Sequence, residues 1–181
     1  MYILTGPVHS GKTTLLQNTI PVLKEKNLRI DGYLSEANWK NKEFIGYDLV
    51  DLKDFCYHPF IRQRGQKEWQ RISSFYFLPE TLDRAIRIIH RCKKNVDLCI
   101  VDEVGPLELK GNGVWPALKD VLKISKQNLL LVVRKSILKD LMGKMQRDDF
   151  VVYDIDKNKT PALLAESLSR NIEKMRESVS Q

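Results

Sequence analysis

The residues with the clearest chemical potential lie near the start of the chain. Residues 6–13 read Gly-Pro-Val-His-Ser-Gly-Lys-Thr, which is the G-x-x-x-x-G-K-T spacing of the phosphate-binding P-loop. Glycine allows backbone conformations closed to other residues, and successive N–H groups at the start of a helix favour an anion. Tyr2–Thr5 before the motif is strand-prone, and a helical pattern begins at Thr14. This strand–loop–helix context predicts a cradle for the phosphates of a nucleotide.

Two residues of the motif have distinct expected roles. We expect Lys12 to reach the β- and γ-phosphates and the Thr13 hydroxyl to hold a Mg²⁺ ion. The alternative is a glycine-rich turn that binds nothing, and the flanking strand and helix argue against it. The residues expected to contact the nucleotide are Gly6, Pro7, Val8, His9, Ser10, Gly11, Lys12, Thr13 and Thr14.

An acidic pair follows an apolar run later in the chain. Four apolar residues, Leu98–Val101, precede Asp102 and Glu103, and such a run is typical of a strand covered on both faces. Asp102 is expected to orient Mg²⁺ through a water. Side-chain alternation past the strand end would turn Glu103 toward the γ-phosphate, where a carboxylate can orient an attacking water. The alternative is that Asp102 caps a turn and Glu103 faces solvent.

Phosphoryl transfer also benefits from a cation near the transferred group. Arg134 directly follows the apolar run Leu129–Val133 and is the first candidate. Arg62 is the second, because residues 61–71 are rich in Arg and Lys and predict an exposed loop. That loop could close over phosphates as a lid or could be a plain surface connection. Each arginine could equally be solvated.

The elements that must position these residues alternate along the chain. Alternating strands and helices predict an α/β fold with a largely parallel sheet, whose ligand lies beyond the carboxyl ends of the strands. Pro21 should kink or shorten the first helix, and the polar segment Asn38–Glu43 suggests a hairpin between two strands. The predicted strands are 2–5, 28–34, 44–50, 55–57, 74–78, 97–103, 129–133 and 150–155, and the predicted helices are 12–26, 79–93, 114–125, 137–142 and a final one from 161.

Composition narrows the class of protein. The 181 residues, 43% of them hydrophobic, predict a single domain over residues 1–181. No apolar run approaches the roughly 18 residues of a membrane span, and a strand at residue 2 leaves no room for a signal peptide, so the cytoplasm is the expected compartment. The cysteines Cys56, Cys92 and Cys99 form no C-x-x-C pair and predict small buried side chains rather than a disulfide or zinc framework.

Four stretches together resemble the small P-loop nucleoside-triphosphatase family, known from thermophile enzymes and from a cancer-related animal relative. They are Thr5-Gly6-Pro7 with Gly11–Leu15, Asp31–Glu36 (Asp-Gly-Tyr-Leu-Ser-Glu), Ile45–Val50 (Ile-Gly-Tyr-Asp-Leu-Val) and Val101–Leu109 (Val-Asp-Glu-Val-Gly-Pro-Leu-Glu-Leu). The last stretch, with the Gly-Tyr-x-x-Glu element inside the second, is much more specific than the P-loop alone.

The resemblance implies a three-layer P-loop NTPase fold with an added antiparallel hairpin. It also implies Mg²⁺-dependent hydrolysis of nucleoside 5'-triphosphates such as ATP and GTP to diphosphate and phosphate, with loose base preference. It places Glu36 near the phosphate end and matches Arg62 to a family arginine. One departure is Arg134-Lys135, where relatives often have Gly-Thr, so the γ-phosphate partner stays open.

Two other functions remain open at this point. A kinase for a nucleoside or another small metabolite would explain the basic segment 61–71. A nucleotide-dependent switch or a nucleic-acid-binding module would explain the net charge of +7, although no nucleic-acid module is recognisable. Nucleoside triphosphates are the expected partners, nucleic acid is not favoured, and a monomer is favoured over an oligomer.

Overall fold

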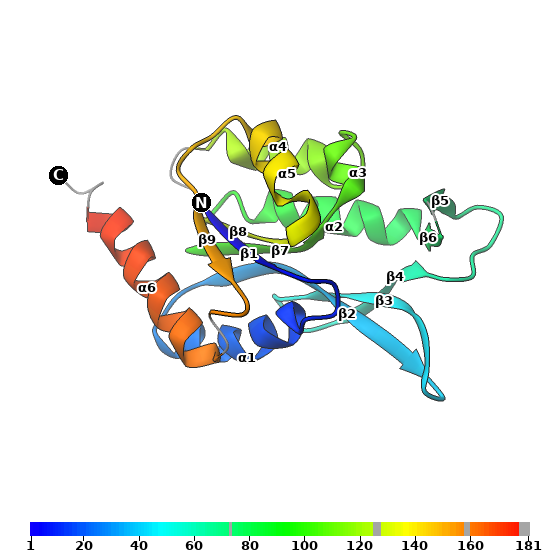
Figure 1. Ribbon diagram of the computed structural model, residues 1–181, viewed down its shortest axis with the longest axis horizontal. Helices are drawn as coiled ribbons and strands as arrows, with labels where there is room; N and C mark the ends of the chain where they lie inside the picture. The colour runs from blue at the N-terminus through cyan, green and yellow to red at the C-terminus, as the bar shows by residue number, and fades with distance from the viewer. Residues whose placement is uncertain (73, 125–127, 158–159, 178–181) are drawn as a thin grey trace.

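A computed structural model of the chain describes residues 1–72, 74–124, 128–157 and 160–177. Its centre is a nine-stranded sheet with the order β5-β6-β4-β3-β2-β7-β8-β1-β9 (Figure 1). The strands are β1 (Tyr2–Gly6), β2 (Ile30–Lys40), β3 (Glu43–Asp51), β4 (Tyr57–Arg62), β5 (Gln70–Ile72), β6 (Phe75–Phe77), β7 (Leu98–Val104), β8 (Leu129–Arg134) and β9 (Val151–Asp154).

The sheet has a parallel half and an antiparallel half. Strands β2, β7, β8, β1 and β9 run parallel, while β3, β4, β6 and β5 extend the sheet in antiparallel pairs. The predicted hairpin is β2–β3, and its two-residue turn at Asn41 and Lys42 has positive φ at both positions, as tight hairpin turns require. The predicted parallel sheet and hairpin are confirmed, and three further antiparallel strands widen the sheet.

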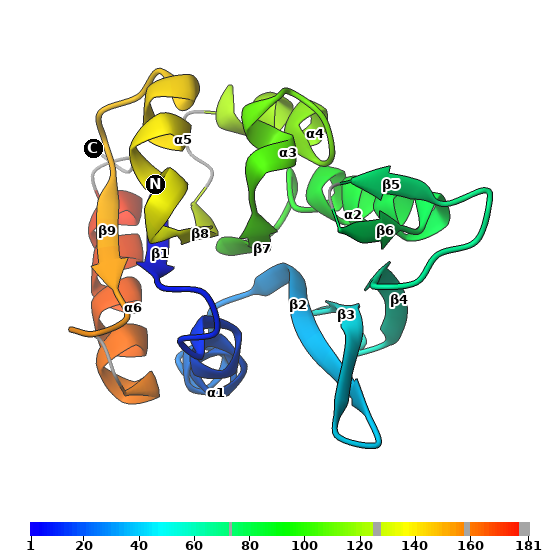
Figure 2. The same cartoon turned by 45° about the vertical axis from the view of Figure 1, so that its right-hand side comes forward.

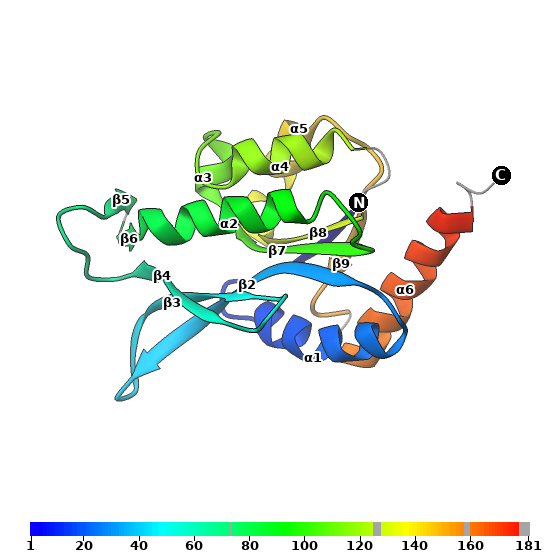
Figure 3. The same cartoon turned by 180° about the vertical axis from the view of Figure 1, so that it is seen from behind.

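Helices cover both faces of this sheet and complete three layers (Figures 2 and 3). One face packs against α1 and α6, and the other against α2, α4 and α5, with a separate apolar core on each side. The helices are α1 (Lys12–Glu25), α2 (Pro79–Arg91), α3 (Pro106–Leu109), α4 (Trp115–Leu122), α5 (Leu138–Met145) and α6 (Pro161–Glu177), with a 3-10 turn at Lys135–Ile137. The three-layer α/β prediction is therefore confirmed.

Several local predictions were wrong. Pro21 lies inside α1, which continues to Glu25, so the proline does not shorten the helix as one of the two expected effects would have it. β2 continues six residues beyond the predicted end at 34, since antiparallel pairing with β3 carries it into the hairpin. The short helix α3 after Gly105 was not predicted. Cys56 is exposed, whereas Cys92 and Cys99 are buried.

Two other boundaries differ from the sequence-based ones. The predicted loop 61–71 begins inside β4 and ends inside β5, so only residues 63–69 connect strands. The predicted helix 114–125 runs from Trp115 to Leu122, and residue 125 lies outside the described residues.

Gly32 is required where β2 lies against β7. Its φ is +121°, and a Cβ atom there would lie 1.9 Å from the Ile100 carbonyl oxygen. We expect Gly32→Ala to lower the free energy of unfolding by about 3–5 kcal/mol, because both the backbone conformation and the close approach exclude a side chain. Urea unfolding measures this. Gly143→Ala is the control: a Cβ there meets nothing within 4 Å, so helical alanine should gain up to about 1 kcal/mol.

A buried carboxylate at the start of β7 should make stability depend on pH. Asp97 is 7% exposed and is paired with Arg29 at 2.9 Å and Arg176 at 2.6 Å. Burial alone would raise the pKa of Asp97, but hydrogen bonds from Arg29 and Arg176 hold this pKa well below its usual 3.8. A depressed pKa adds stability that is present above about pH 4 and lost as the pH falls below it.

We therefore expect Asp97→Asn to cost about 1–2 kcal/mol at pH 7, a modest value because both arginines are half-exposed. The loss of unfolding free energy in Asp97→Asn, measured by urea titration, should become smaller as the pH is lowered from 5 to 2.5. Exposed Asp83 provides the matched control, since Asp83→Asn should change stability by less than about 0.5 kcal/mol at any pH. A deficit that stays constant with pH would refute the assignment.

Candidate active site

The P-loop joins β1 to α1 at the carboxyl edge of the parallel strands (Figure 2). Gly11 adopts the left-handed conformation with φ +84° and begins α1, and no side-chain hydrogen bond caps this helix within the described structure. The backbone N–H groups of the first turn are therefore available to hydrogen-bond to the loop or to a ligand that the loop binds. A helix start of this kind favours an anion.

Lys12 extends its ammonium group over the loop. Its Nζ donates to the Pro7 carbonyl at 2.6 Å and lies 3.4 Å from the Gly6 carbonyl and from Ser10 Oγ. Burial lowers the pKa of Lys12, while the charges of Glu103 and Asp102 counteract this shift. The lysine is thus a partly desolvated cation within electrostatic reach of both carboxylates.

Thr13 and Asp102 meet at the end of β7. The Thr13 hydroxyl donates to Asp102 Oδ2 at 2.8 Å, and the Ser35 N–H donates to the same oxygen at 3.1 Å. Asp102 is fully buried. Burial and the nearby charge of Glu103 raise the pKa of Asp102, against the hydrogen bonds from Ser35 and Thr13. A cation beside this carboxylate would favour its ionised form.

Glu103 is positioned by a strained backbone. Its φ is +59°, a region that costs a non-glycine residue of order 1–3 kcal/mol. The pairing of β7 with β8 shifts register between Val101 and Val104, so Glu103 leaves the strand alternation. Its Oε2 accepts a hydrogen bond from Arg134 Nη2 at 3.2 Å. A bulge, rather than the simple alternation expected from the sequence, therefore sets the direction of the Glu103 side chain.

Several of these groups line one cavity of about 190 Å³, which we call the cradle. The P-loop, Glu103 and the hairpin strands β2 and β3 all contribute to its lining. Its lining residues are Val8, His9, Ser10, Gly11, Lys12, Thr13, Thr14, Ser35, Ala37, Tyr47 and Glu103. The structure thus brings Glu103 and most of the P-loop residues named from the sequence to one cavity.

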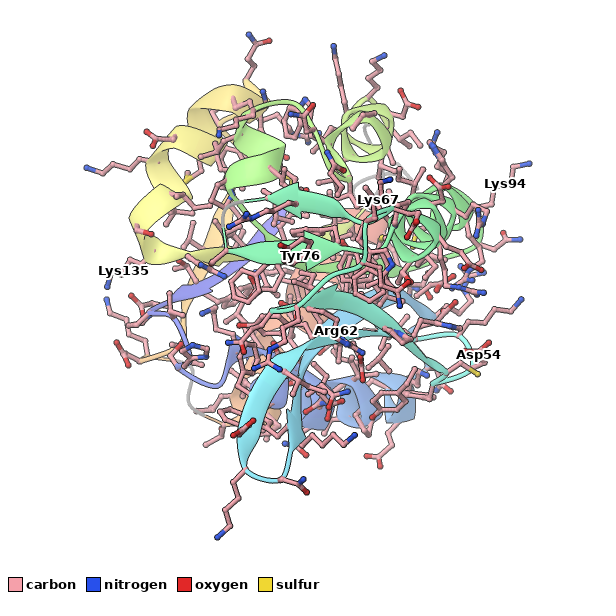
Figure 4. The ribbon with its side chains drawn as sticks, turned by 90° about the vertical axis from the view of Figure 1, so that its right-hand side faces the viewer. Asp54, Arg62, Lys67, Tyr76, Lys94 and Lys135 are labelled. Atoms are coloured by element: carbon pink, nitrogen blue, oxygen red, sulfur yellow. The ribbon has the colours of Figure 1, made fainter. Side chains whose placement is uncertain are left out.

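Some predicted residues lie outside the lining of the cradle: Asp102 and Arg134 contact residues that line it, Gly6 and Pro7 belong to the P-loop, and Glu36 and Arg62 have partners elsewhere. Glu36 accepts hydrogen bonds from Gln17 at 2.7 Å and Tyr57 at 3.0 Å, outside the lining of the cradle. Arg62 is held on β4 by Asp48 at 2.5 Å and donates to the Tyr47 carbonyl at 2.7 Å (Figure 4). Arg62 therefore supports a wall of the cradle from behind, and Arg134 is the arginine that lies beside Glu103.

The basic loop lies far from the P-loop. Residues 63–69 project from the β4–β5 end of the sheet, opposite the edge that carries β1 and β9 (Figures 1 and 3). Gly65 lies against the ring of Tyr76, where a Cβ would come within 2.1 Å. This position gives no support to a lid over the phosphates.

Sequence reasoning missed three residues of the cradle, Ser35, Ala37 and Tyr47. Ser35 was quoted only as part of a motif, yet its N–H binds Asp102 and its buried Oγ has no hydrogen-bond partner within the described residues. Tyr47 lies on β3, which only the hairpin brings beside the P-loop. The extension of β2 past residue 34 is the missing signal, because it determines which side chains face the loop.

The oxygen atoms around Asp102 fit Mg²⁺. The Thr13 hydroxyl, the Asp102 carboxylate and the unpartnered Ser35 hydroxyl supply oxygen donors alone, the type that magnesium prefers. In the described part of the chain, no three His, Cys, Asp or Glu side chains gather as a metal-binding group. Mg²⁺ is commonly held by one or two carboxylates together with substrate phosphates. The phosphates of a bound nucleotide would therefore supply the remaining oxygen ligands.

Comparison with known families decides the membership of the chain. A family model described as NTPase matches residues 1–168. The chain belongs to the NTPase family. Among the similar proteins of this family is the nucleoside-triphosphatase THEP1 of Methanopyrus kandleri, 28% identical over 156 residues, which are 84% of each chain. The cancer-related nucleoside-triphosphatase homolog of Bos taurus is 28% identical over 175 residues, covering 90% of this chain and 92% of the relative.

Solved structures share the fold of this NTPase. The solution structure of a human cancer-related nucleoside triphosphatase superposes with a TM-score of 0.70 at 22% identity, covering 93% of this chain and 95% of that one. The crystal structure of THEP1 from Aquifex aeolicus gives 0.69 at 19% identity, with 97% and 99% covered. The predicted family and hydrolase class are confirmed. Within the described residues, no helix has the length and apolar character to cross a bilayer.

Proposed function

We propose that this protein hydrolyses nucleoside 5'-triphosphates to the diphosphate and phosphate, with Mg²⁺ bound at Thr13 and Asp102. The observation that carries the proposal is that Lys12, Thr13 and Glu103 line one small cavity at a helix start, with Asp102 bonded to Thr13 and Arg134 bonded to Glu103. Cation, metal ligands and general base are the parts that phosphoryl transfer to water requires.

In this mechanism the P-loop binds the phosphates, and the groups around Glu103 act on the attacking water and the transferred phosphoryl group. The N–H groups of the P-loop hold the phosphates, and Lys12 moves its ammonium from the Pro7 carbonyl to the β- and γ-phosphate oxygens. Bound Mg²⁺ supplies charge neutralisation and Thr13 and Asp102 hold it. Glu103 orients the attacking water and accepts its proton. Arg134 stabilises charge that develops on the transferred group.

A second opening suits the nucleoside end. A cavity of about 450 Å³ adjoins the P-loop through Ser10, Gly11 and Thr14, which both cavities share. Its other lining residues are Leu15, Asn18, Ile155, Asp156 and Pro161. Among the described residues of this lining, Asn18 and Asp156 are the longer polar side chains, and they offer few hydrogen bonds to a base. This favours loose base preference, because discrimination between bases requires several fixed hydrogen bonds.

The other functions receive less support. The basic loop that motivated a kinase lies at the opposite end of the sheet from the P-loop. The net charge of +7 that motivated a nucleic-acid module is accompanied by no known nucleic-acid-binding motif. Hydrolysis with water as acceptor therefore remains the best-supported function.

A nucleotide panel tests the proposal. Purified protein is incubated with ATP, GTP, CTP or UTP, with Mg²⁺ or with excess EDTA, and released phosphate is measured. We expect phosphate release from every nucleotide, with rates within about tenfold of one another, and loss of activity without Mg²⁺. Release that persists in EDTA, or that equals the Lys12→Ala background, would overturn the proposed function.

A further inference from the structure

A third cavity, separate from the cradle and from the 450 Å³ cavity, lies beyond Glu103 on the side away from the P-loop. Its volume is about 300 Å³, at the small end of ligand-binding pockets. It is enclosed by β3, β4, β5 and β6 on one side and by residues 103–114 on the other. Glu103 and Tyr47 line both this cavity and the cradle. This cavity therefore opens at the expected γ-phosphate end of the cradle.

Five aromatic side chains line this cavity: Tyr33, Tyr47, Phe60, Phe75 and Phe77. Tyr33 meets Phe60 edge-on with ring centroids 6.2 Å apart, and Phe60 meets Phe77 at 5.9 Å. Tyr47 and Phe75 lie 6.4 Å apart. On β6 the alternation places Phe75 and Phe77 on the opposite face from Tyr76, which Figure 4 labels at this end of the molecule. Rings arranged edge-on around a gap favour a flat aromatic guest, which can stack or meet them edge-to-face.

The charged side chains at this cavity are mainly hydrogen-bond acceptors, and the hydroxyls of Tyr33, Tyr47 and Ser74 can donate as well as accept. Glu103 and Glu108 contribute carboxylates, and Arg134 is the single cation among the lining residues. Glu108 is buried and already accepts from the N–H groups of Gly105 at 2.8 Å and Val114 at 3.1 Å. Within the described residues, the side chain that donates to the Glu103 carboxylate is Arg134, so the carboxylate has room for another donor. The lining therefore favours a donor and disfavours an anion.

We propose that this cavity binds a small uncharged aromatic molecule with a hydroxyl or amine group, which donates to Glu103 and slows hydrolysis. The effect on hydrolysis rests on the proposed function, whereas the binding does not. Slowing follows because a carboxylate oxygen that accepts from the ligand no longer orients the attacking water. The aromatic body remains in the apolar cavity, so the nucleotide is not displaced from the P-loop.

The cavity is a poor place for the base of the nucleotide itself. Lys12 approaches the β- and γ-phosphates, and Glu103 follows on the γ side, so the α-phosphate and nucleoside extend toward Thr14. A base in the aromatic cavity would require the triphosphate to run backwards through the cradle. Binding at the two places should therefore be simultaneous.

The probe for the test is 2-naphthol, a flat aromatic alcohol that is neutral at pH 7. Its fluorescence is titrated with the protein in the absence of nucleotide, with naphthalene-2-carboxylate as the anionic comparison. We expect a Kd of about 10–100 µM for 2-naphthol and at least tenfold weaker binding of the carboxylate. ATP hydrolysis with saturating 2-naphthol should show kcat lowered at least threefold and KM changed less than twofold.

Two cavity-filling variants make the test specific. Leu82 on α2 and Ile72 on β5 line this cavity and are absent from the lining of the cradle. Leu82→Trp should therefore abolish 2-naphthol binding and keep basal hydrolysis. Ile72→Trp serves the same purpose if Leu82→Trp does not fold. Leu163→Trp on α6, where Leu163 is 55% exposed, should retain binding as the matched control.

Four results would overturn the proposal. The first three are no saturable binding of 2-naphthol, binding that both filling variants retain, and competition between 2-naphthol and a nonhydrolysable ATP analogue. Formation of 2-naphthyl phosphate would also overturn it, because the hydroxyl would then be a phosphoryl acceptor rather than an inhibitor. If the protein binds 2-naphthol but releases no phosphate from any nucleotide, the site stands and the proposed function fails.

Discussion

Replacing Lys12 by alanine is expected to lower kcat/KM for ATP by about 10³-fold or more. The ammonium group is the only cation that the P-loop itself contributes to the cradle, and a preorganised charge at the transferred phosphates commonly contributes 10²–10³-fold or more. Because Lys12 contacts both the ground state and the transition state, kcat should fall and KM should rise. Steady-state phosphate release over a range of ATP concentrations measures both parameters.

The matched control for this prediction is Lys26→Ala, an exposed lysine directly after the same helix. Its kinetics should stay within about twofold of the parent protein. Thermal unfolding of Lys12→Ala should show an intact fold, since the ammonium hydrogen-bonds only to its own loop. Activity within tenfold of the parent would mean that the triphosphate binds somewhere other than this loop.

Glu103→Gln is the prediction with the second-largest effect. The amide keeps the size of the carboxylate and can still accept from Arg134, but it cannot take a proton from water. We therefore expect kcat to fall by about 10²–10⁴-fold while the affinity for a nonhydrolysable ATP analogue changes less than threefold. Stopped-flow phosphate release and fluorescence titration separate the two quantities.

Exposed Glu80, in the first turn of α2, provides the control, and Glu80→Gln should hydrolyse ATP normally. Arg134→Met tests the other half of the pair and should lower kcat without abolishing nucleotide binding, because Arg134 acts on charge that develops during the reaction. A Glu103→Gln protein with near-normal kcat would assign the general base to another group. Asp102 would then be examined next, since its carboxylate accepts the hydrogen bond from Thr13.

The sequence alone determined the parts of this NTPase that depend on local spacing. Gly6, Gly11 and Lys12 must be close in sequence to form one loop, and a buried run ending in Asp102 predicts a strand end without further information. The rule that parallel strands share a carboxyl edge then brought Asp102, Glu103 and Arg134 to the P-loop. Helix and strand order followed from periodicity in the same way.

Only the tertiary structure decided which side chains from distant parts of the sequence face the cradle. Arg62 and Glu36 matched a family pattern, but Asp48, Gln17 and Tyr57 engage them outside the cavity lining. Strand pairing and register set these contacts, and neither can be read from residue spacing.

The direction of Glu103 was likewise a tertiary result, since a positive φ of 59° at a bulge is imposed by the neighbouring strands. The aromatic cavity beyond it arises from rings on four strands that approach only when the antiparallel half of the sheet forms. Local sequence therefore specified the phosphate end of the site, and long-range pairing specified what surrounds it.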